Sequence, residues 1–398
     1  MPELFNLVPP DEARTTWFEN IPVTIQPETI PTEEALGRVT AGSMRSPMAL
    51  PAFPRSTVDG YAVKGADTVG ASESLPAYLA VVGEVPMGRA ATVNVGPGQT
   101  AIVHTGGMIP PGADAVVMVE RTQRLDDRDI EVLRPVAVGE NIINVGEDIL
   151  EGEEILPTGH LLRPQDVGGL LAVGLTETVV ARRPRVALIA TGDEVVPPSQ
   201  ALGPGQVRDI NTYTLAGQVA RAGGVPWSMG IIPDRFEALK AAAAQGLAEA
   251  DVVVMSAGSS VSVRDMTGDV INELGEPGVL VHGISFRPGK PTVLAICDGK
   301  PVVGLPGNPV SAMVVFNLLV TPMLWRLQGL IHPPQPRTVK ARLARNVASV
   351  AGREDRIQVR LEQREDGVWA DPVFGKSNLI FILVKADGMI KVPLDKNG

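Results

Sequence analysis

The stretch ADVVVMSAGSSVSVRDMTGD, residues 250–269, decides the fold of the largest part of this chain. The apolar, β-branched run at 252–255 predicts a buried strand. Small residues follow at 256–260, and the charged residues Arg264 and Asp265 come next. In open α/β sheets, a strand, a small-residue loop and a helix start form a place where backbone N–H groups approach an anion. An ordinary strand–loop–helix connection is the alternative, because the stretch has no GxGxxG fingerprint and no P-loop.

The surrounding sequence repeats this alternation of strands and helices. Apolar runs predict strands at 186–190, 227–232, 292–296 and 301–305, and helices are expected at 212–221, 234–247, 266–274 and after Pro309. Asp298-Gly299 predicts a hairpin between the last two strands. This order is typical of a mostly parallel, doubly wound α/β domain.

The rest of the chain has a different texture, with short strand candidates and many Gly and Pro turns. A Pro-rich linker at 329–337 precedes a tail in which apolar and charged residues alternate, and the arginines of that alternation are expected to lie on a solvated strand face. The fold class expected is α/β and β multidomain: a doubly wound α/β domain, a β-rich insertion, an irregular elongated domain and a small C-terminal β-barrel. The domain boundaries expected are 1–28 plus 182–328 for the α/β domain, 29–53 plus 139–181 for the elongated linking and dimerisation domain, 54–138 for the insertion, and 329–398 for the C-terminal domain.

Composition excludes several classes of function. The 398 residues carry a net charge of −10, which argues against general nucleic-acid binding. The single cysteine, Cys297, permits no intrachain disulfide and no multi-cysteine zinc site, and we expect a reducing, cytoplasmic compartment and an inert thiol. We expect neither a signal peptide nor a membrane span, because the apolar run 310–327 is interrupted by polar residues and reads as a buried helix.

Three predicted strands are each followed by a carboxylate: Glu194, Asp234 and Asp265. Oxygen ligands that converge at one edge of a sheet suit a hard cation bound to phosphates. Asp234 also has a simpler interpretation as a helix N-cap, with Glu237 completing a capping box. The segments FRPGKP at 286–291 and LPGNP at 305–309 add cations and a preset loop, so we expect a phosphate-containing substrate and Mg²⁺.

Segments outside the α/β part leave alternatives open. Asp59-Gly60 predicts a turn before a strand, and His104 is expected to be packed among its apolar neighbours. Glu147-Asp148 suits either a magnesium ion or a solvated turn.

Seven motifs, taken together, carry a resemblance to a known family. SAGSSVSVRD is similar to the SGG-[VS]-S-x-G-x-x-D element of the molybdopterin-binding fold. STVDGYA, HTGGMIPPGAD, GEDI, TGDE, RPGKP and LPGNPVSA occur in the order found in molybdopterin molybdenumtransferases, the MoeA family and the gephyrin E-domain. The resemblance spans residues 31–389.

The resemblance implies an elongated homodimer that inserts molybdate into adenylylated molybdopterin, releases AMP and requires Mg²⁺. Its active cleft would lie between the α/β domain and the β-rich insertion of the partner subunit, and molybdopterin adenylyltransferase is an expected partner. The catalytic positions fall on Asp59, Thr105, Asp148, Glu194, Asp234 and Asp265, of which Glu194, Asp234 and Asp265 are the expected metal ligands. The substrate-binding positions fall on Ser256, Gly258, Ser259, Ser260, Arg264, Arg287, Lys290, Pro306, Pro309 and Ser377.

This sequence also departs from the family pattern, mainly by losing cations. Ile143, Asn144 and Val145 stand where family members often have three Arg, and Gly283 stands where a Lys is usual. Arg287 replaces the first Lys of KPGKP, and an Arg fork binds phosphate well. The alternatives that these changes raise are a non-catalytic molybdopterin carrier or scaffold and a relative that prefers tungstate.

Overall fold

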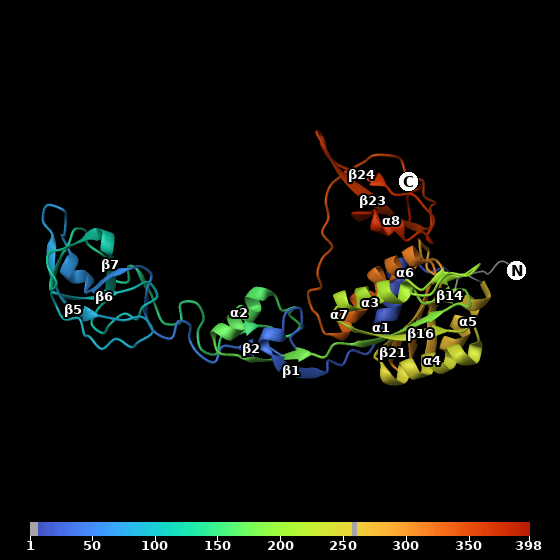
Figure 1. Cartoon of the computed structure of the whole chain (residues 1–398), viewed down its shortest axis with the longest axis horizontal. Coiled ribbons are helices and arrows are strands. Elements are labelled where there is room, and N and C mark those ends of the chain that lie inside the picture. Colours follow the sequence, from blue (N-terminus) through green and yellow to red (C-terminus); the bar gives the residue numbers. More distant parts are fainter. Residues whose placement is uncertain (1–6, 257–260) are drawn as a thin grey trace.

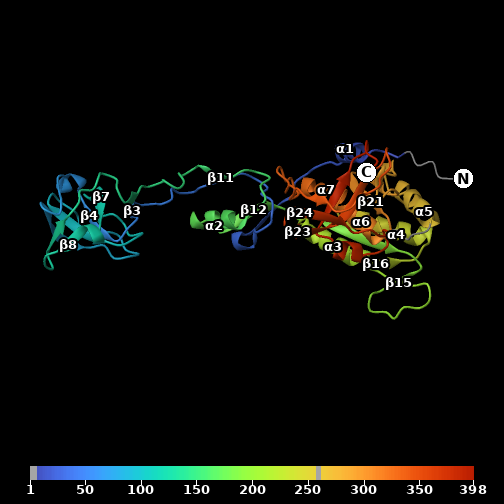
Figure 2. The ribbon, with the colours of Figure 1, turned by 90° about the horizontal axis from the view of Figure 1, so that it is seen from above.

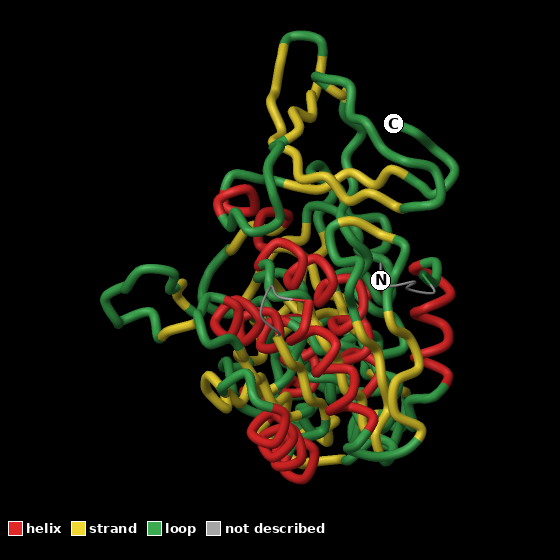
Figure 3. Tube along the Cα trace, turned by 90° about the vertical axis from the view of Figure 1, so that its right-hand side faces the viewer, coloured by secondary structure: helices red, strands yellow, loops and turns green. Residues whose placement is uncertain are grey.

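The computed structural model describes residues 7–256 and 261–398, without the side chains of 261–265. The molecule is elongated (Figures 1 and 2). A β-rich lobe lies at one end and a slender linking segment, in which the chain runs out and back, follows it. At the other end an α/β body carries a small C-terminal β lobe, which Figure 3 shows above the helices of the body.

The α/β body is built on a six-stranded sheet that confirms the predicted α/β fold. Its order is β16 (Val225–Ile232), β13 (Arg185–Thr191), β17 (Val252–Ser256), β21 (Lys300–Leu305), β20 (Val293–Cys297) and β18 (Pro277–His282). The first four strands are parallel, β20 runs antiparallel to β21, and β18 runs antiparallel to β20. Because parallel strands end on the same side, the ends of β13, β17 and β21 meet at one edge.

Residues of β13 point alternately into two cores, one on each face of the sheet. Val186 and Leu188 pack with α1 (Pro10–Glu19), α3 (Asn211–Arg221) and the helical stretch 309–327. Ala187 and Ile189 pack with α4 (Phe236–Glu249) and α5 (Val261–Asn272). The N-terminal helix is tied to the sheet by Trp17, which is fully buried and whose Nε1 donates to the Ala295 carbonyl at 3.0 Å.

The apolar stretch 309–327 is helical throughout. It consists of α6 (Pro309–Val315), a π-helical turn η4 (Phe316–Val320) and α7 (Thr321–Leu327). By length and composition alone it could cross a membrane, but 61% of its window is buried inside the protein. That burial, against the sheet, is what the core helix of an α/β body shows.

The β-rich lobe contains a sheet of order β7 (Ala115–Met118), β4 (Gly60–Val63), β6 (Gln99–Val103), β5 (Ala77–Glu84), β9 (Asp129–Val132) and β8 (Thr122–Arg124). β4 lies in its interior and is buried along its whole length. A Cβ atom at Gly60 would lie 2.0 Å from the Val117 carbonyl oxygen, so only glycine allows β7 to approach β4 here.

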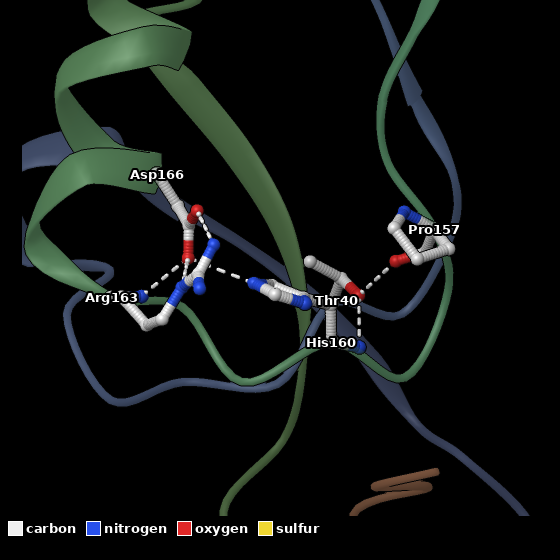
Figure 4. Close-up of polar contacts among 5 residues, drawn as sticks. All are labelled: Thr40, Pro157, His160, Arg163 and Asp166. Atoms are coloured by element: carbon white, nitrogen blue, oxygen red, sulfur yellow. Dashed lines mark hydrogen bonds and ion pairs between the residues drawn. The ribbon is translucent and has the colours of Figure 1, made fainter. Parts of the chain in front are cut away.

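The linking segment consists of short antiparallel pairs and one helix. The pairs join β1 (Pro27–Pro31) to β12 (Glu177–Ala181), β2 (Met44–Arg45) to β11 (Glu154–Leu156), and β3 (Arg55–Ser56) to β10 (Ile142–Ile143). Helix α2 (Pro164–Ala172) is fixed at its start by the buried carboxylate of Asp166. Asp166 accepts bonds from the Arg163 backbone and guanidinium and from His160 Nε2 at 2.8–2.9 Å (Figure 4).

The C-terminal lobe is a sheet of order β19 (Phe286–Arg287), β23 (Glu354–Arg364), β24 (Gly367–Pro372) and β22 (Arg342–Leu343), with β25 (Gly388–Val392) also paired to β23. β19 precedes β20 in the chain, so residues from the α/β part complete this sheet. The chain turns between β23 and β24 at Glu365-Asp366, and Gly367 is the first residue of β24. The four-part division itself stays a prediction.

Several predicted local features are wrong. The segment TEEALG at 32–37 has the composition of a short helix, but it forms a single 3₁₀ turn, η1 (Thr32–Glu34). Thr32 does not cap it, because its hydroxyl bonds the Leu175 carbonyl and the Thr178 hydroxyl instead. The run AVVMVE at 115–120 favours a strand over its whole length, but β7 ends at Met118. Tertiary contacts outweigh local propensity at these short elements.

Replacing Asp166 by Asn tests the stability of the linking segment. Hydrogen bonding by Arg163 holds the pKa of the Asp166 carboxyl well below its usual range. The stabilisation is therefore fully present at neutral pH and is lost as the pH falls below about 4 toward the lower folded pKa. We expect Asp166→Asn to cost about 1–3 kcal/mol at pH 7, with a difference from wild type that shrinks in acid.

Scanning calorimetry of both proteins between pH 7 and pH 3 measures this difference. Asp127→Asn is the control, because that carboxylate is fully exposed and its ion pair with Arg124 is worth little. An Asp166→Asn protein as stable as wild type at pH 7 would contradict the prediction.

Candidate functional site

Two of the predicted carboxylates lie at the carboxyl edge of the sheet. Thr191 ends β13, and its hydroxyl donates to Asp234 Oδ1 at 2.5 Å. The Asp234 backbone N–H donates to Asp193 Oδ1 at 3.2 Å, which links the loops that follow β13 and β16. The N-cap interpretation of Asp234 is wrong, because α4 begins at Phe236 with Arg235 as its N-cap and without a side-chain cap bond. Asp234 is thus held by a neighbouring strand end.

A cavity of about 490 Å³ opens at this edge, and we term it the strand-end cavity. It brings together three predicted site residues, Glu194, Ser256 and Pro309. The long loop that carries β14 (Val195–Val196) and β15 (Val207–Arg208), which projects from the body in Figure 2, forms one wall. The sequence interpretation missed the lining residues Thr191, Arg208, Asp209, Asn211, Asn308 and Asn378.

Asn211 connects two of the predicted substrate loops. It is the first residue of α3 and is 8% exposed. Its Nδ2 donates to Ser256 Oγ at 2.7 Å and to the Gly307 carbonyl at 2.8 Å. Asp209 Oδ1 accepts the Thr212 N–H at 3.0 Å and so fixes the start of the helix. In the sequence, Asp209-Ile210-Asn211 precedes a predicted helix. This pattern indicates the start of a helix and gives no indication that Asn211 lines a cavity.

A second cavity, of about 550 Å³, lies between the α/β body and the C-terminal lobe, and we term it the interlobe cavity. It holds four other predicted site residues, namely Arg287, Lys290, Pro306 and Ser377. Sequence reasoning placed them in one site with the carboxylates, whereas the structure places them in a neighbouring cavity. Asn308 lines both cavities, and its Nδ2 donates to Ser377 Oγ at 3.0 Å.

The interlobe cavity is rich in cations. Arg353, Arg356 and Lys376 line it together with Arg287 and Lys290, against the single carboxylate of Asp355. Asp355 is 3% exposed and takes a two-pronged bond from Arg353 at 2.8 and 3.0 Å. The excess of positive charge makes this cavity suited to an anion.

Arg353 and Arg356 come from the C-terminal lobe, where a solvated arginine face was expected. Arg360, on β23, is exposed, as expected for a solvated strand face. Arg342 forms an ion pair with Asp366 and lies over the ring of Trp369. Arg356 instead bonds Glu354, which is 2% exposed and also accepts from Lys391 at 2.7 Å. Acidic neighbours therefore anchor these arginines at the cavity wall.

Asp59 and Thr105 meet in the β-rich lobe. The Thr105 backbone N–H donates to Asp59 Oδ1 at 2.9 Å. The expectation that His104 is packed in the core is wrong, because its side chain is 41% exposed and lies between two carboxylates. Its Nε2 lies 2.8 Å from Glu84 Oε1, and its Nδ1 lies 3.7 Å from Asp59 Oδ1. A strand end on the lobe surface explains this exposure.

Asp148 lies in the linking segment, where its N–H bonds the Leu50 carbonyl. The adjacent Glu147 accepts the Asn144 N–H within a turn. Figures 1 and 2 both place the β-rich lobe at the opposite end of the molecule from the α/β body. Within one chain, therefore, Asp59 and Thr105 do not join the strand-end cavity.

Some predicted residues fall outside what the structure describes. Gly258, Ser259 and Ser260 lie outside the described residues. Arg264 and Asp265 belong to α5, but their side chains are outside the description as well. Cys297 is buried, its Sγ donates to the Ile271 carbonyl at 3.4 Å, and burial raises its pKa to about 11. A thiol in that state is a poor nucleophile, as expected.

Comparison with known proteins matches nearly the whole chain. Residues 8–174 match the MoeA N-terminal region (domain I and II), 187–326 a probable molybdopterin binding domain, and 340–398 the MoeA C-terminal region (domain IV). The chain is 32% identical to molybdopterin molybdenumtransferase 2 of Mycobacterium tuberculosis over 93% of this chain and 92% of that protein. It is 31% identical to the molybdopterin molybdenumtransferase of Haemophilus influenzae over 96% and 95%.

A solved structure agrees with these relatives. The molybdopterin biosynthesis MoeA protein of Pyrococcus horikoshii superposes with a TM-score of 0.84 at 38% identity, over 98% of this chain and 95% of that one. Three family models that match in order, one fold and the same relatives over nearly the whole length lead to one assignment: the chain belongs to the MoeA family of molybdopterin molybdenumtransferases, the transferases of molybdenum cofactor biosynthesis.

Proposed function

We propose that this protein inserts molybdate into adenylylated molybdopterin, releases AMP and requires Mg²⁺. The observation that carries the proposal is the pair of cavities that share Asn308. One lies at the ends of parallel strands, where α/β sheets bind nucleotides. The other is cationic and suits a small oxyanion. Two substrates of these classes would meet at the shared wall.

The pterin nucleotide is assigned to the strand-end cavity. Ser256 and the loop from Gly307 to Pro309 offer polar groups and backbone to the strand-end cavity. We propose that Gly258, Ser259, Ser260 and Arg264 continue this surface. Glu194 lines the cavity, and Asp234 is held beside it by Thr191. With Asp265, these carboxylates are the proposed catalytic groups of this subunit.

Magnesium fits this edge as a phosphate-bound ion. Among the described residues, no three acidic, His or Cys side chains gather closely enough to hold a metal alone. Mg²⁺ characteristically uses one or two carboxylates with water and substrate phosphates. Glu194, Asp234 and Asp265 are the proposed carboxylates, and bound Mg²⁺ would offset phosphate charge.

Molybdate is assigned to the interlobe cavity. Arg287 and Lys290 lie on the side of the α/β body, and Ser377 lies on the C-terminal side. Lys and Arg outnumber Asp and Glu in residues 338–398, although the whole chain carries −10. A positive lobe on an acidic protein concentrates an incoming oxyanion at this cavity.

The remaining catalytic residues require a second copy of the chain. Asp59, Thr105 and Asp148 lie in the β-rich lobe and the linking segment, away from the strand-end cavity of their own chain. A homodimer that places each β-rich lobe against the other α/β body would complete both sites. We further propose a cytoplasmic location and substrate transfer from a molybdopterin adenylyltransferase.

The replacement of family cations by uncharged residues supports a second candidate function. Ile143, Asn144, Val145 and Gly283 replace family cations, which favours a molybdopterin carrier or scaffold without turnover, or a tungstate-preferring relative. Under the main proposal, Arg287, Arg353 and Arg356 supply the positive charge instead.

A direct assay separates these functions. Purified protein with adenylylated molybdopterin, Mg²⁺ and molybdate is expected to release AMP and to yield cofactor that activates an apo-molybdoenzyme. EDTA should stop AMP release, and tungstate in place of molybdate reports the oxyanion preference. Tight binding of the nucleotide without AMP release would refute the proposal and support a carrier.

Substitution of Arg287 tests the oxyanion assignment. Loss of a charge-assisted hydrogen bond should raise the KM for molybdate at least tenfold in Arg287→Ala, with a smaller change in kcat. Arg287→Lys should recover part of the affinity, because it restores the charge but not the fork.

Arg360→Ala is the matched control, since Arg360 lies exposed on β23 outside the cavity. Its KM for molybdate should equal that of wild type. An Arg287→Ala enzyme with an unchanged KM would remove Arg287 from the oxyanion site.

A further inference from the structure

The linking segment joins the α/β body at a narrow place that we term the neck (Figures 1 and 2). The chain leaves the body through Gln26, which directly precedes β1, and returns through Arg182, which directly follows β12. Residues 182–184 alone separate β12 from β13 of the large sheet. Contacts that fix these two crossings therefore fix the direction in which the linking segment leaves the body.

Arg182 is bonded to both crossings and to the sheet. Its backbone N–H donates to the Gln26 carbonyl at 2.7 Å, and its Nε donates to Gln26 Oε1 at 2.6 Å. Its other two guanidinium nitrogens form a two-pronged bond with the Asp251 carboxylate, at 2.7 and 3.0 Å. Asp251 directly precedes β17, an interior strand of the sheet.

Asp251 is itself held by the neighbouring strand. Its Oδ2 accepts the Arg185 N–H at 2.7 Å, and its own N–H donates to the Arg185 carbonyl at 2.9 Å. The pair is partly buried, with 37% of the Arg182 side chain and 29% of the Asp251 side chain exposed. A two-pronged bond of this kind fixes orientation as well as distance.

The apolar contacts of the neck hold it together without fixing its angle. Val39 and Ala181 of the linking segment are buried in a small cluster with Leu330. Burial of apolar surface is non-directional, so such a cluster tolerates a small rotation. The Ile331 N–H also donates to the Gly159 carbonyl at 3.1 Å, but that bond joins the linking segment to the Pro-rich linker and not to the sheet.

We propose that Arg182 and Asp251 are positioning residues of the molybdenum-insertion site: their bond sets the angle of the linking segment, and thereby the place at which the β-rich lobe of one subunit meets the strand-end cavity of its partner. The inference rests on the proposed function, in which two subunits build each site. Because the β-rich lobe lies at the far end of the linking segment, a small rotation at the neck becomes a larger displacement of Asp59 and Thr105. A misplacement of about 1 Å can cost about a hundredfold in rate.

A mixed dimer with one intact site tests the inference. One subunit carries Glu194→Gln and donates only its β-rich lobe, and the other carries Asp59→Asn and donates only its strand-end cavity. Different affinity tags on the two subunits allow this dimer to be purified. Arg182→Ala is then placed in one subunit or in the other, and AMP release from adenylylated molybdopterin is measured.

The effect of Arg182→Ala should depend on the subunit that carries it. In the lobe-donating subunit it should lower kcat about tenfold or more and change the KM for the nucleotide about twofold or less, because the binding cavity belongs to the other subunit. In the cavity-donating subunit it moves only a lobe that is already inactive, so kcat should stay within about twofold of the parent dimer. Equal losses from the two placements would overturn the inference.

Two further variants serve as controls. Arg182→Lys in the lobe-donating subunit should recover part of the rate, because it restores the charge without the two-pronged bond. Lys240→Ala removes the ion pair with Glu273 inside the α/β body, and the Lys240 side chain is as exposed as that of Arg182. It should leave kcat unchanged in either subunit.

Pulsed electron paramagnetic resonance follows the angle at the neck independently of catalysis. Spin labels at Gln165→Cys on α2 and Tyr213→Cys on α3, both exposed positions, report the distance from the linking segment to the body, and the buried Cys297 stays unlabelled. After dilution with unlabelled protein, the chain with Arg182 intact should give one narrow distance. Arg182→Ala should broaden or shift it, and Lys240→Ala should not.

The outcomes separate this inference from the proposed function. A distance distribution that Arg182→Ala leaves unchanged overturns the inference even if molybdenum insertion proceeds. A distribution that broadens in Arg182→Ala, in a protein that releases no AMP in any combination of subunits, upholds the role of the pair at the neck and refutes the enzymatic proposal.

Discussion

The parallel pairing of β13, β17 and β21 is the constraint on which the candidate site depends. These strands are buried on both faces, so their register is fixed by two apolar cores at once. Because they run in the same direction, their polar ends are carried to one edge. The contacts between Thr191 and Asp234 and between Asn211 and Ser256 then set the loops there.

The position of the C-terminal lobe is set by contacts with the loops near the same edge of the sheet. Phe286 and Arg287 pair with β23, so the chain that leads into the antiparallel part of the large sheet also completes the small one. The Asn308–Ser377 bond and the Val310 N–H donated to the Ser377 carbonyl hold the lobe against the start of α6. The contact between the α/β body and the C-terminal lobe therefore shapes both cavities, and Asn308 lines both of them.

Sequence patterns predicted the α/β sheet well, because strands such as 252–255 are apolar without interruption and are flanked by small or charged residues. Short elements were predicted less well, since the environment of Thr32 or Asp234 is set by residues far away in the chain. The division into two cavities could not be predicted. Arg353 carries no local signal of function, Asn211 signals only a helix start, and Asn308 belongs to a loop whose own position the sequence does not give. Only tertiary folding places these residues beside Arg287, Ser256 and Ser377.

The distance between the β-rich lobe and the α/β body leads to the central claim, that two chains build each site. Mixing Asp59→Asn and Glu194→Gln subunits tests it most directly. Each variant alone should be inactive in molybdenum insertion, whereas random reassociation gives mixed dimers with one intact site and about a quarter of the wild-type activity. Mixed dimers that form but remain as inactive as the parent variants would contradict a site shared between subunits.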